Sequence, residues 1–369
     1  MNETVLTWIV FILAFGGMVL IHEFGHFIAA RLCGIEVEEF GIGLPTPKAL
    51  TLFTWQGTRF TLNWLPLGGF VRPKGENDPN VPGGLASASP WKRLIVLFAG
   101  PLMNLLAAVL IYTLIFNRVG VPDTSKVLVA SVTSQSPAAT AGFQDGDIFV
   151  TGNGQSITSI DALRAIIDQN VDQPISFVVN RDGEQVDLTA TPQMNTQEKR
   201  AMIGVGLGAP FKQNGSWIET MNLGVQYTGY SVRTLIALPA QLIRGTISSE
   251  QGRIIGLKGI YDVLQQSVSH DVEASGAPQT TATDPIDQPV RTLELLASLT
   301  ISLGVFNLFP FPALDGGRII FVLPELIFRR RVSPQIENLV HGMGMAFLLI
   351  FMIYVNVMDF INPANITIP

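Results

Sequence analysis

Long apolar runs separated by polar segments dominate the pattern along this chain. Four runs, over residues 4–30, 94–116, 295–314 and 339–358, carry few or no charged side chains. A helix needs about 20 apolar residues to cross a bilayer. We therefore predict four transmembrane helices and an α-helical polytopic membrane protein.

A different pattern fills the loop between the first two runs. Within residues 41–72, polar and apolar residues alternate on both sides of Gln56-Gly57, which is typical of a β-hairpin. The strands are unusually apolar for a solvated loop, and non-helical backbone at membrane depth must be covered by protein. We predict a membrane-associated β-hairpin, although an interfacial hairpin without a functional role fits the same pattern.

The middle of the chain has the pattern of a soluble α/β domain. Over residues 121–210, short strand-like runs alternate with Asp-Gly and Asn-Gly turns, and one helical stretch covers residues 159–169. Residues 211–290 are amphipathic and end in a segment of small and polar residues. We predict extracytoplasmic helices and a flexible linker there, between membrane segments at 1–118 and 291–369.

Basic residues set the expected orientation of these segments. They gather between the first two runs, as at Arg31, Lys74 and Arg93, and between the last two, as at Arg318 and Arg330. The positive-inside rule places both loops in the cytoplasm. The two termini and the soluble domain are then extracytoplasmic, and the end of the first run lies near the cytoplasmic side.

Composition agrees with a membrane protein and narrows its partners. The chain is 47% hydrophobic and only 14% charged, with a mean hydropathy of +0.37, so membrane lipid is an expected partner. A net charge of −6 argues against binding to nucleic acid. Cys33 is the single cysteine, which excludes a disulfide within the chain.

The strongest chemical signal is His22-Glu23-Phe24-Gly25-His26 at the end of the first run. Histidines four residues apart project from one face of a helix and can bind one metal ion. Glu23 between them is placed to act as a general base toward water. A solvated helix end is the simpler alternative, but ionisable groups inside a membrane span are costly and usually functional.

A zinc site with an open position for water needs a third protein ligand. Asp315 follows the third apolar run, just after Pro310 and Pro312 interrupt the helix, at the same expected depth as the two histidines. We predict that it completes a Zn²⁺ site, whereas a carboxylate that merely ends a helix is the alternative. Two other candidates, His341 and Cys33, are weaker: the first would fill the open position, and the second lies about two turns beyond His26.

Several motifs together resemble one known family. They are the HEFGH motif, Gly100-Pro101-Leu102-Met103-Asn104 in the second run, and Asn307 with Pro310 and Leu314-Asp315-Gly316 near the third. Between them, Ser136-Pro137-Ala138 and Gly146-Asp147-Ile148 resemble the pattern of a bacterial PDZ domain. The chain thus resembles the site-2 protease family of intramembrane zinc metalloproteases, in its bacterial RseP-like type but with room for one PDZ domain.

The resemblance implies hydrolysis of peptide bonds within or near transmembrane segments of single-span membrane proteins in a bacterial inner membrane. Such cleavage serves regulated intramembrane proteolysis, as in release of an anti-sigma factor or clearance of signal-peptide remnants. It also implies that Asn307 helps to hold the substrate backbone. A PDZ-like domain can accept a peptide or a substrate domain along a sheet edge, although a spacer that binds nothing is also compatible with the sequence.

A helical substrate must unwind before cleavage, because its carbonyl groups are otherwise hydrogen bonded. The predicted hairpin can supply new partners by strand addition. The candidate substrate-binding residues there are Phe60, Thr61, Leu62, Asn63 and Trp64.

Two other function classes remain as alternatives. A membrane metal transporter would also place His and Asp in a span, but along a path and with no need for Glu23. A catalytically inactive PDZ scaffold would not need an intact HExxH motif.

Overall fold

The computed structural model describes residues 3–43, 50–65, 68–195, 200–213, 215–246, 253–276 and 288–362. The chain divides into two compact units. The first combines Met1–Ile115, Met221–Gly276 and Pro289–Pro369, and the second combines Phe116–Thr220 and Ala277–Gln288.

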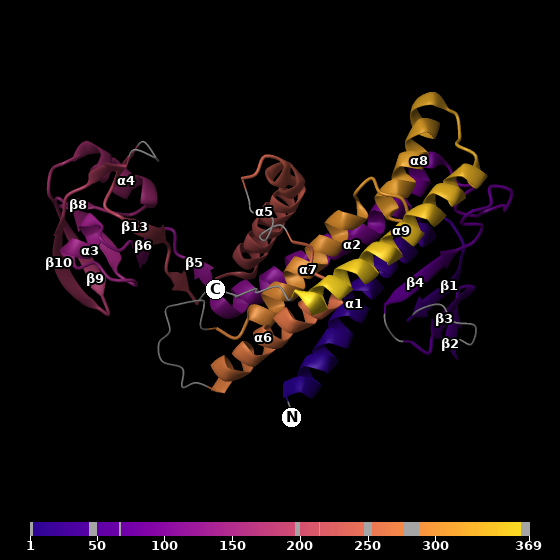
Figure 1. Cartoon of the computed structure of the whole chain (residues 1–369), viewed down its shortest axis with the longest axis horizontal. Coiled ribbons are helices and arrows are strands. Elements are labelled where there is room, and N and C mark those ends of the chain that lie inside the picture. Colours follow the sequence, from indigo (N-terminus) through magenta and orange to yellow (C-terminus); the bar gives the residue numbers. More distant parts are fainter. Residues whose placement is uncertain are drawn as a thin grey trace. The chain divides into compact units, whose positions relative to one another are not determined.

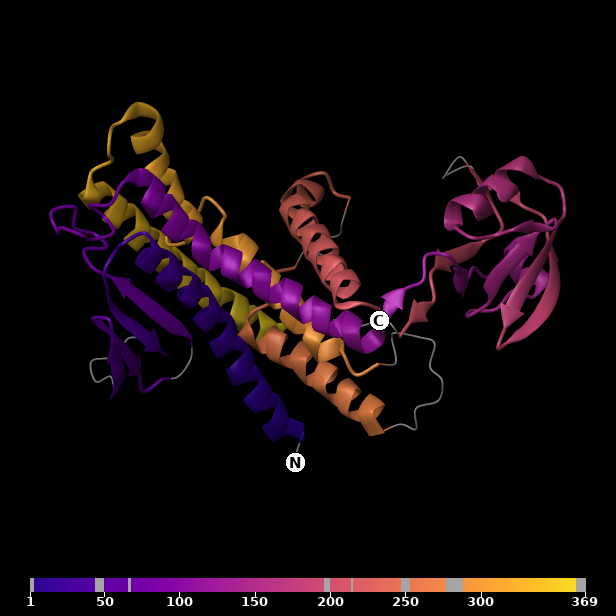
Figure 2. The same cartoon turned by 180° about the vertical axis from the view of Figure 1, so that it is seen from behind.

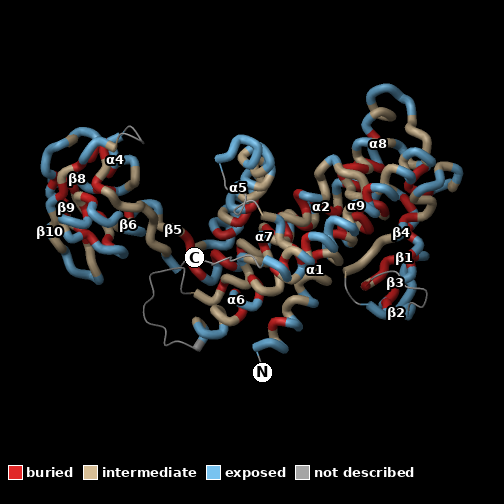
Figure 3. Tube along the Cα trace, in the orientation of Figure 1, coloured by how far each residue is buried: buried red, intermediate tan, exposed pale blue. Residues whose placement is uncertain are grey.

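Helices make up most of the first unit, where α1, α2, α7 and α9 lie side by side (Figures 1 and 2). The helices are α1 (Glu3–Leu32), α2 (Pro90–Val119), α5 (Trp217–Ile243), α6 (Leu257–Gly276), α7 (Arg291–Asn307), α8 (Asp315–Phe328) and α9 (Pro334–Ile361). Within the described ranges, α1, α2 and α9 are long and apolar enough to cross a membrane. Large apolar side chains such as Leu13, Leu110 and Ile350 stay exposed on them, as a lipid-facing surface requires. Figure 3 colours the chain by burial and shows exposed stretches along these helices.

The third predicted span is shorter than the sequence pattern suggested. Helix α7 ends at Asn307 instead of continuing to residue 314, and it has 17 residues. Pro310 and Pro312 explain this, because proline lacks an N–H donor and disfavours helical backbone in the residue before it. At about 26 Å, α7 is slightly shorter than the hydrocarbon core. The count of four spans therefore stays a prediction.

The segment predicted as extracytoplasmic helices forms α5 and α6. Tyr261 of α6 lies against Trp8 of α1, with ring centroids 4.6 Å apart. Asp359 near the end of α9 accepts hydrogen bonds from the backbone N–H groups of Gly256 and Gly259, at 2.6 and 3.2 Å, and so caps the start of α6. Helix α6 is therefore packed against the apolar helices. Of the predicted linker, residues 273–276 belong to α6, and residues 277–287 lie outside the described residues.

The predicted hairpin is part of a larger sheet. Its four strands are β1 (Val37–Ile42), β2 (Leu50–Trp55), β3 (Thr58–Leu62) and β4 (Gly69–Pro73), in the order β2-β3-β1-β4. β2 and β3 pair antiparallel, β3 and β1 parallel, and β1 and β4 antiparallel. Every residue of β2 is exposed, including Leu50, Phe53 and Trp55. The membrane association of the hairpin stays a prediction.

The position of β3 corrects the expected site of strand addition. β3 lies inside the sheet, with β2 on one side and β1 on the other. Beyond its end, the Asn63 N–H donates to the Ile42 carbonyl at 3.0 Å. The backbone of residues 58–63 is therefore already paired, and the prediction that an unwound substrate adds there is wrong.

The second unit contains the PDZ-like domain. Its main sheet has the order β10-β9-β7-β6-β13, with β8 paired to β7. The elements are β5 (Val121–Pro122), β6 (Val127–Val132), α3 (Pro137–Ala141), β7 (Ile148–Gly152), β8 (Gln155–Ser156), α4 (Ile160–Gln169), β9 (Ile175–Arg181), β10 (Glu184–Ala190), β11 (Gln193–Asn195), β12 (Arg200–Met202), β13 (Val205–Gly208) and β14 (Phe211–Lys212). Val129, Phe149, Leu163 and Phe177 are buried in one core between sheet and helices.

Local chemistry explains the short helix α3. The Ser136 side chain accepts the N–H of Ala139 at 3.1 Å, and Pro137 follows at the first helical position. Gly142 ends the helix with φ +85°, a conformation that glycine adopts without steric cost. The Ser-Pro-Ala pattern seen in the sequence is thus a helix start.

Candidate metal centre

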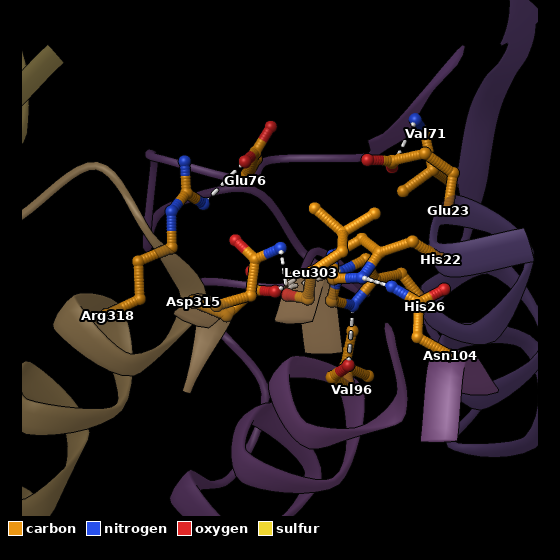
Figure 4. A network of polar contacts seen from close by, with 11 residues as sticks. His22, Glu23, His26, Val71, Glu76, Val96, Asn104, Leu303, Asp315 and Arg318 are labelled. Carbon is orange, nitrogen blue, oxygen red and sulfur yellow. Dashed lines mark hydrogen bonds and ion pairs between the residues drawn. The ribbon is translucent and has the colours of Figure 1, made fainter. Parts of the chain in front are cut away.

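Three predicted ligands meet at one point of the first unit (Figure 4). Helix α1 presents His22 and His26 one turn apart, and Asp315 is the first residue of α8. His22 Nε2 lies 3.0 Å from Asp315 Oδ2, and His26 Nε2 lies 3.3 Å from the same oxygen. The two Nε2 atoms are 3.1 Å apart. Both histidines are buried, and the three ligand atoms form a nearly equilateral triangle.

This triangle has the dimensions of a zinc site. Bonds of 2.0–2.1 Å in a tetrahedral arrangement separate neighbouring ligand atoms by about 3.3 Å. The observed separations of 3.0 to 3.3 Å match one face of such a tetrahedron. Two imidazoles and one carboxylate are also a donor set that zinc accepts in enzymes while one position stays open. The residues therefore fit a catalytic zinc ion.

Helix α2 orients His26 through its backbone. His26 Nδ1 donates to the Val96 carbonyl oxygen at 2.8 Å, which leaves the Nε2 lone pair for a metal. This contact requires α1 and α2 to approach closely. A Cβ atom at Gly100 would lie 2.3 Å from His26 Nε2, and one at Gly25 would lie 2.3 Å from the Ala99 carbonyl oxygen. Glycine at these two positions is what allows the approach.

Asn104, also on α2, lies against the other histidine. It is fully buried, and its Nδ2 atom is 3.2 Å from His22 Nδ1. Its Oδ1 atom is buried without a hydrogen-bond partner in the described part of the chain. Turning the amide by 180° lets Oδ1 accept from His22 Nδ1, which satisfies the oxygen and frees Nε2 for a metal. Asn104 had no predicted role from the sequence, although a polar amide inside an apolar run is a signal of one.

Glu23 lies beside the triangle and is held by the sheet. Its Oε2 atom accepts the backbone N–H of Val71 on β4 at 3.0 Å. Because this N–H points at α1, it does not take part in the pairing of β4 with β1. Figure 4 shows Glu23 and Val71 next to the two histidines. The proposed base is thus half-buried and oriented by an edge strand.

The candidate substrate-binding residues make contacts of their own, apart from the three ligands. Asn307 ends α7 and donates from Nδ2 to the Leu303 carbonyl at 3.0 Å. Phe60 packs on Phe40 and Phe27, with ring centroids 5.6 and 5.7 Å apart, between the sheet and α1. Thr61 donates to Glu39 Oε1 at 3.0 Å. Substrate binding by Asn307, Phe60 and Thr61 stays a prediction.

The last three candidates in the hairpin differ in exposure. Leu62 and Trp64 are exposed, whereas Asn63 is buried and both of its amide atoms lack a partner in the described part of the chain. Substrate binding by Leu62, Asn63 and Trp64 also stays a prediction.

Two weaker candidates lie outside the triangle. His341 Nδ1 accepts the Ala313 N–H at 2.9 Å, so this atom is engaged by backbone. Cys33 is a free thiol packed beside the core formed by Phe27, Ile35 and Phe40.

A family model and full-length relatives match nearly the whole chain. The model of peptidase family M50 matches residues 10–351. A protein of Brucella suis, named provisionally as a zinc metalloprotease, is 31% identical over 95% of this chain and 93% of its own length. A metalloprotease of Caulobacter vibrioides is 29% identical over 91% of each chain. The solved PDZ domain of an SdrC-like protein from Listeria monocytogenes matches 22% of this chain and 87% of its own, with 19% identity and a TM-score of 0.21.

Proposed function

The chain belongs to peptidase family M50 and is a membrane zinc metalloprotease, and on that premise we propose that it cleaves peptide bonds within or near transmembrane segments. Its substrates are single-span membrane proteins, and its activity serves regulated proteolysis, such as release of an anti-sigma factor or removal of signal-peptide remnants. One observation carries the proposal. Two corners of the triangle, His22 and His26, lie on the long apolar helix α1, and this supports a site that acts on peptide inside the membrane.

Each side chain at the site has a distinct task. When bound, zinc supplies a Lewis acid that polarises the scissile carbonyl and makes water a better nucleophile. His22, His26 and Asp315 hold it, and the contacts of Val96 and Asn104 orient the two imidazoles. Glu23 takes a proton from the attacking water and returns it to the leaving amine.

We place the cleaved segment along β4 instead of β3. β4 is an outer strand of the sheet, and the Val71 N–H faces α1 and the proposed base. An unwound substrate has unpaired N–H and C=O groups that a free strand edge satisfies. In this structure the Val71 N–H on this edge donates to Glu23 Oε2, so a substrate that pairs with β4 takes the place of that contact. The peptide bond that pairs nearest Val71 then lies beside Glu23 and the ligands.

Val71→Pro should lower cleavage at least about tenfold while zinc content stays at the wild-type level, because proline removes the N–H that orients Glu23 and that the proposed pairing with substrate uses. Val71→Ala keeps that N–H and should stay close to wild type. Initial rates and zinc analysis of purified variants check both. Equal activity of the proline and alanine variants would contradict binding along β4.

The ligand cluster favours hydrolysis over metal transport. A transporter needs coordinating groups spaced along a path, whereas here the three ligand atoms lie within 4.8 Å of one another and Glu23 stands beside them. An inactive scaffold would have no use for this arrangement.

The proposed location is a bacterial inner membrane, crossed several times. Basic residues before α2 and after α8 support a cytoplasmic position for that end of the helices. The termini and the PDZ-like domain are then extracytoplasmic, and the ligands lie near the cytoplasmic side.

The PDZ-like domain contains a groove of about 270 Å³ suited to an extended peptide. Ile160 and Ile167 of α4 line one side, and Ile203, Val205 and Leu207 line the other. β13 is an outer strand of its sheet, so its free edge supports pairing with a peptide or a substrate domain.

Removing residues 121–210 should leave a short, pre-trimmed substrate cleavable and should admit longer substrates, because this domain selects and performs no chemistry. The measurement compares initial rates on a long and a short substrate with and without the domain. Loss of both activities in a protein that still binds zinc would assign the domain a structural role.

The function is tested with purified protein in lipid vesicles and a model single-span substrate. We expect mass spectrometry to locate the cut inside the apolar segment or within a few residues of it. A soluble peptide with the same flanking sequence is the control. Cleavage of the soluble peptide alone, or zinc transport without hydrolysis, would overturn the proposal.

A further inference from the structure

The turn between α7 and α8 delivers the ligand Asp315, and its backbone is strained. Ala313, two residues before the ligand, has φ +77°. Residues other than glycine rarely adopt this left-handed conformation, and they keep it only where surrounding contacts hold it. The turn therefore needs an external support.

Helix α9 provides contacts to this turn from one face. Gly344 is buried against Pro312, and a Cβ atom added there would lie 2.4 Å from Pro312 Cβ. One turn further along, the rings of Phe347 and Phe311 have centroids 5.7 Å apart. His341 lies one turn before Gly344, so the three residues share a helix face.

Of these three α9 residues, His341 forms a hydrogen bond with the strained residue Ala313. Its Nδ1 atom accepts the Ala313 N–H at 2.9 Å, so the ring proton sits on Nε2. Phe321 of α8 packs against the ring, with centroids 5.4 Å apart. Nε2 is buried and has no hydrogen-bond partner among the described residues. A ring used only to fill space would not need a nitrogen in the Nδ1 position.

We propose that His341 is a positioning residue for the metal ligand Asp315. By accepting the Ala313 N–H, it keeps the turn in the left-handed conformation and sets the place from which the carboxylate meets His22 and His26. The inference rests on the zinc site used in the proposed function and concerns metal affinity, not the choice of substrate. Groups that orient metal ligands typically change affinity 10- to 100-fold when removed.

The test uses variants of His341 in the purified full-length protein. In His341→Asn, the amide oxygen takes nearly the place of Nδ1 and can accept the Ala313 N–H. In His341→Gln, the oxygen lies one methylene farther out, and in His341→Leu the acceptor is absent. Met343→Leu, at an exposed position of the same helix, is the matched control.

Zinc dissociation constants are measured by competition with a chromophoric chelator, and the Co²⁺-loaded protein is compared by visible absorption. We expect His341→Leu and His341→Gln to bind zinc roughly 10- to 100-fold more weakly. His341→Asn and Met343→Leu should stay near wild type, with an unchanged cobalt spectrum.

Wild-type affinity in His341→Leu would overturn the inference, as would equal affinities of the Asn and Gln variants. If His341→Leu fails to fold, the comparison of Asn with Gln still decides, because both carry the same amide group. These readouts do not involve hydrolysis. A chain that binds zinc in this pattern yet cleaves no membrane protein would refute the proposed function and leave the role of His341 standing.

Discussion

Glu23→Gln should reduce peptide hydrolysis at least about 100-fold, the lower end of what a general base contributes, while zinc content stays near wild type. The amide has nearly the shape of the carboxylate but cannot take a proton from water. Glu23 also lies outside the triangle of ligand atoms, so its replacement leaves His22, His26 and Asp315 in place. The measurement pairs cleavage of a single-span substrate with zinc analysis of the same preparation.

Glu184→Gln is the matched control, since Glu184 is an exposed glutamate at the start of β10 in the other unit. It should leave both cleavage and zinc content unchanged. Full activity of Glu23→Gln would rule out Glu23 as the base. Loss of zinc together with activity would instead assign Glu23 to the metal ligands.

Asp315→Ala should lose zinc as well as activity, which separates it from the Glu23 variant. The substitution removes one of three ligand atoms that lie 3.0 to 3.3 Å apart. Mutation of groups that only orient the ligands typically lowers metal affinity 10- to 100-fold. Removing a ligand itself should therefore weaken zinc binding more than about 100-fold. His22→Ala should behave in the same way, because it removes another corner of the triangle.

Asp161→Ala, at an exposed carboxylate of α4, controls for the loss of a negative charge. Zinc stoichiometry and chelator competition are the measurements, and excess zinc should restore little activity to Asp315→Ala. If that variant kept full zinc and full activity, a different group would be the third ligand.

Much of the metal centre was predictable because its parts are local. The spacing of His22 and His26 places both rings on one helix face whatever the rest of the chain does. Asp315 followed from a second local feature, the two prolines that end the third apolar run. The depth of both segments in the membrane then linked residues 293 positions apart.

Contacts with helix α2 were not predictable in the same way. Val96 offers only a backbone carbonyl, which every residue has, so nothing in its side chain marks it as the partner of His26. Asn104 stands inside an apolar run of the sequence, but its burial and its contact with His22 depend on how α1 and α2 pack.

The four-stranded sheet is the feature that the local sequence pattern predicted least completely. Alternation predicted strands on both sides of Gln56-Gly57, because the period of side chains along a strand is local. It did not predict β1 and β4, nor that β3 lies between β2 and β1. Strand order is decided by backbone pairing between distant segments, and every residue offers the same donors and acceptors for it.

By itself, then, the sequence determined the long apolar helices, the HExxH face, the turns of the PDZ-like domain and the break before Asp315, since each depends on neighbours within a few residues. Only the tertiary structure decided that β4 is the strand beside Glu23 and that β3 lies between β2 and β1. The contact of His341 with Ala313 belongs with these, because it joins a side chain to a backbone N–H 28 residues away. Such contacts arise from the packing of whole elements, and the residue types at either end do not specify them.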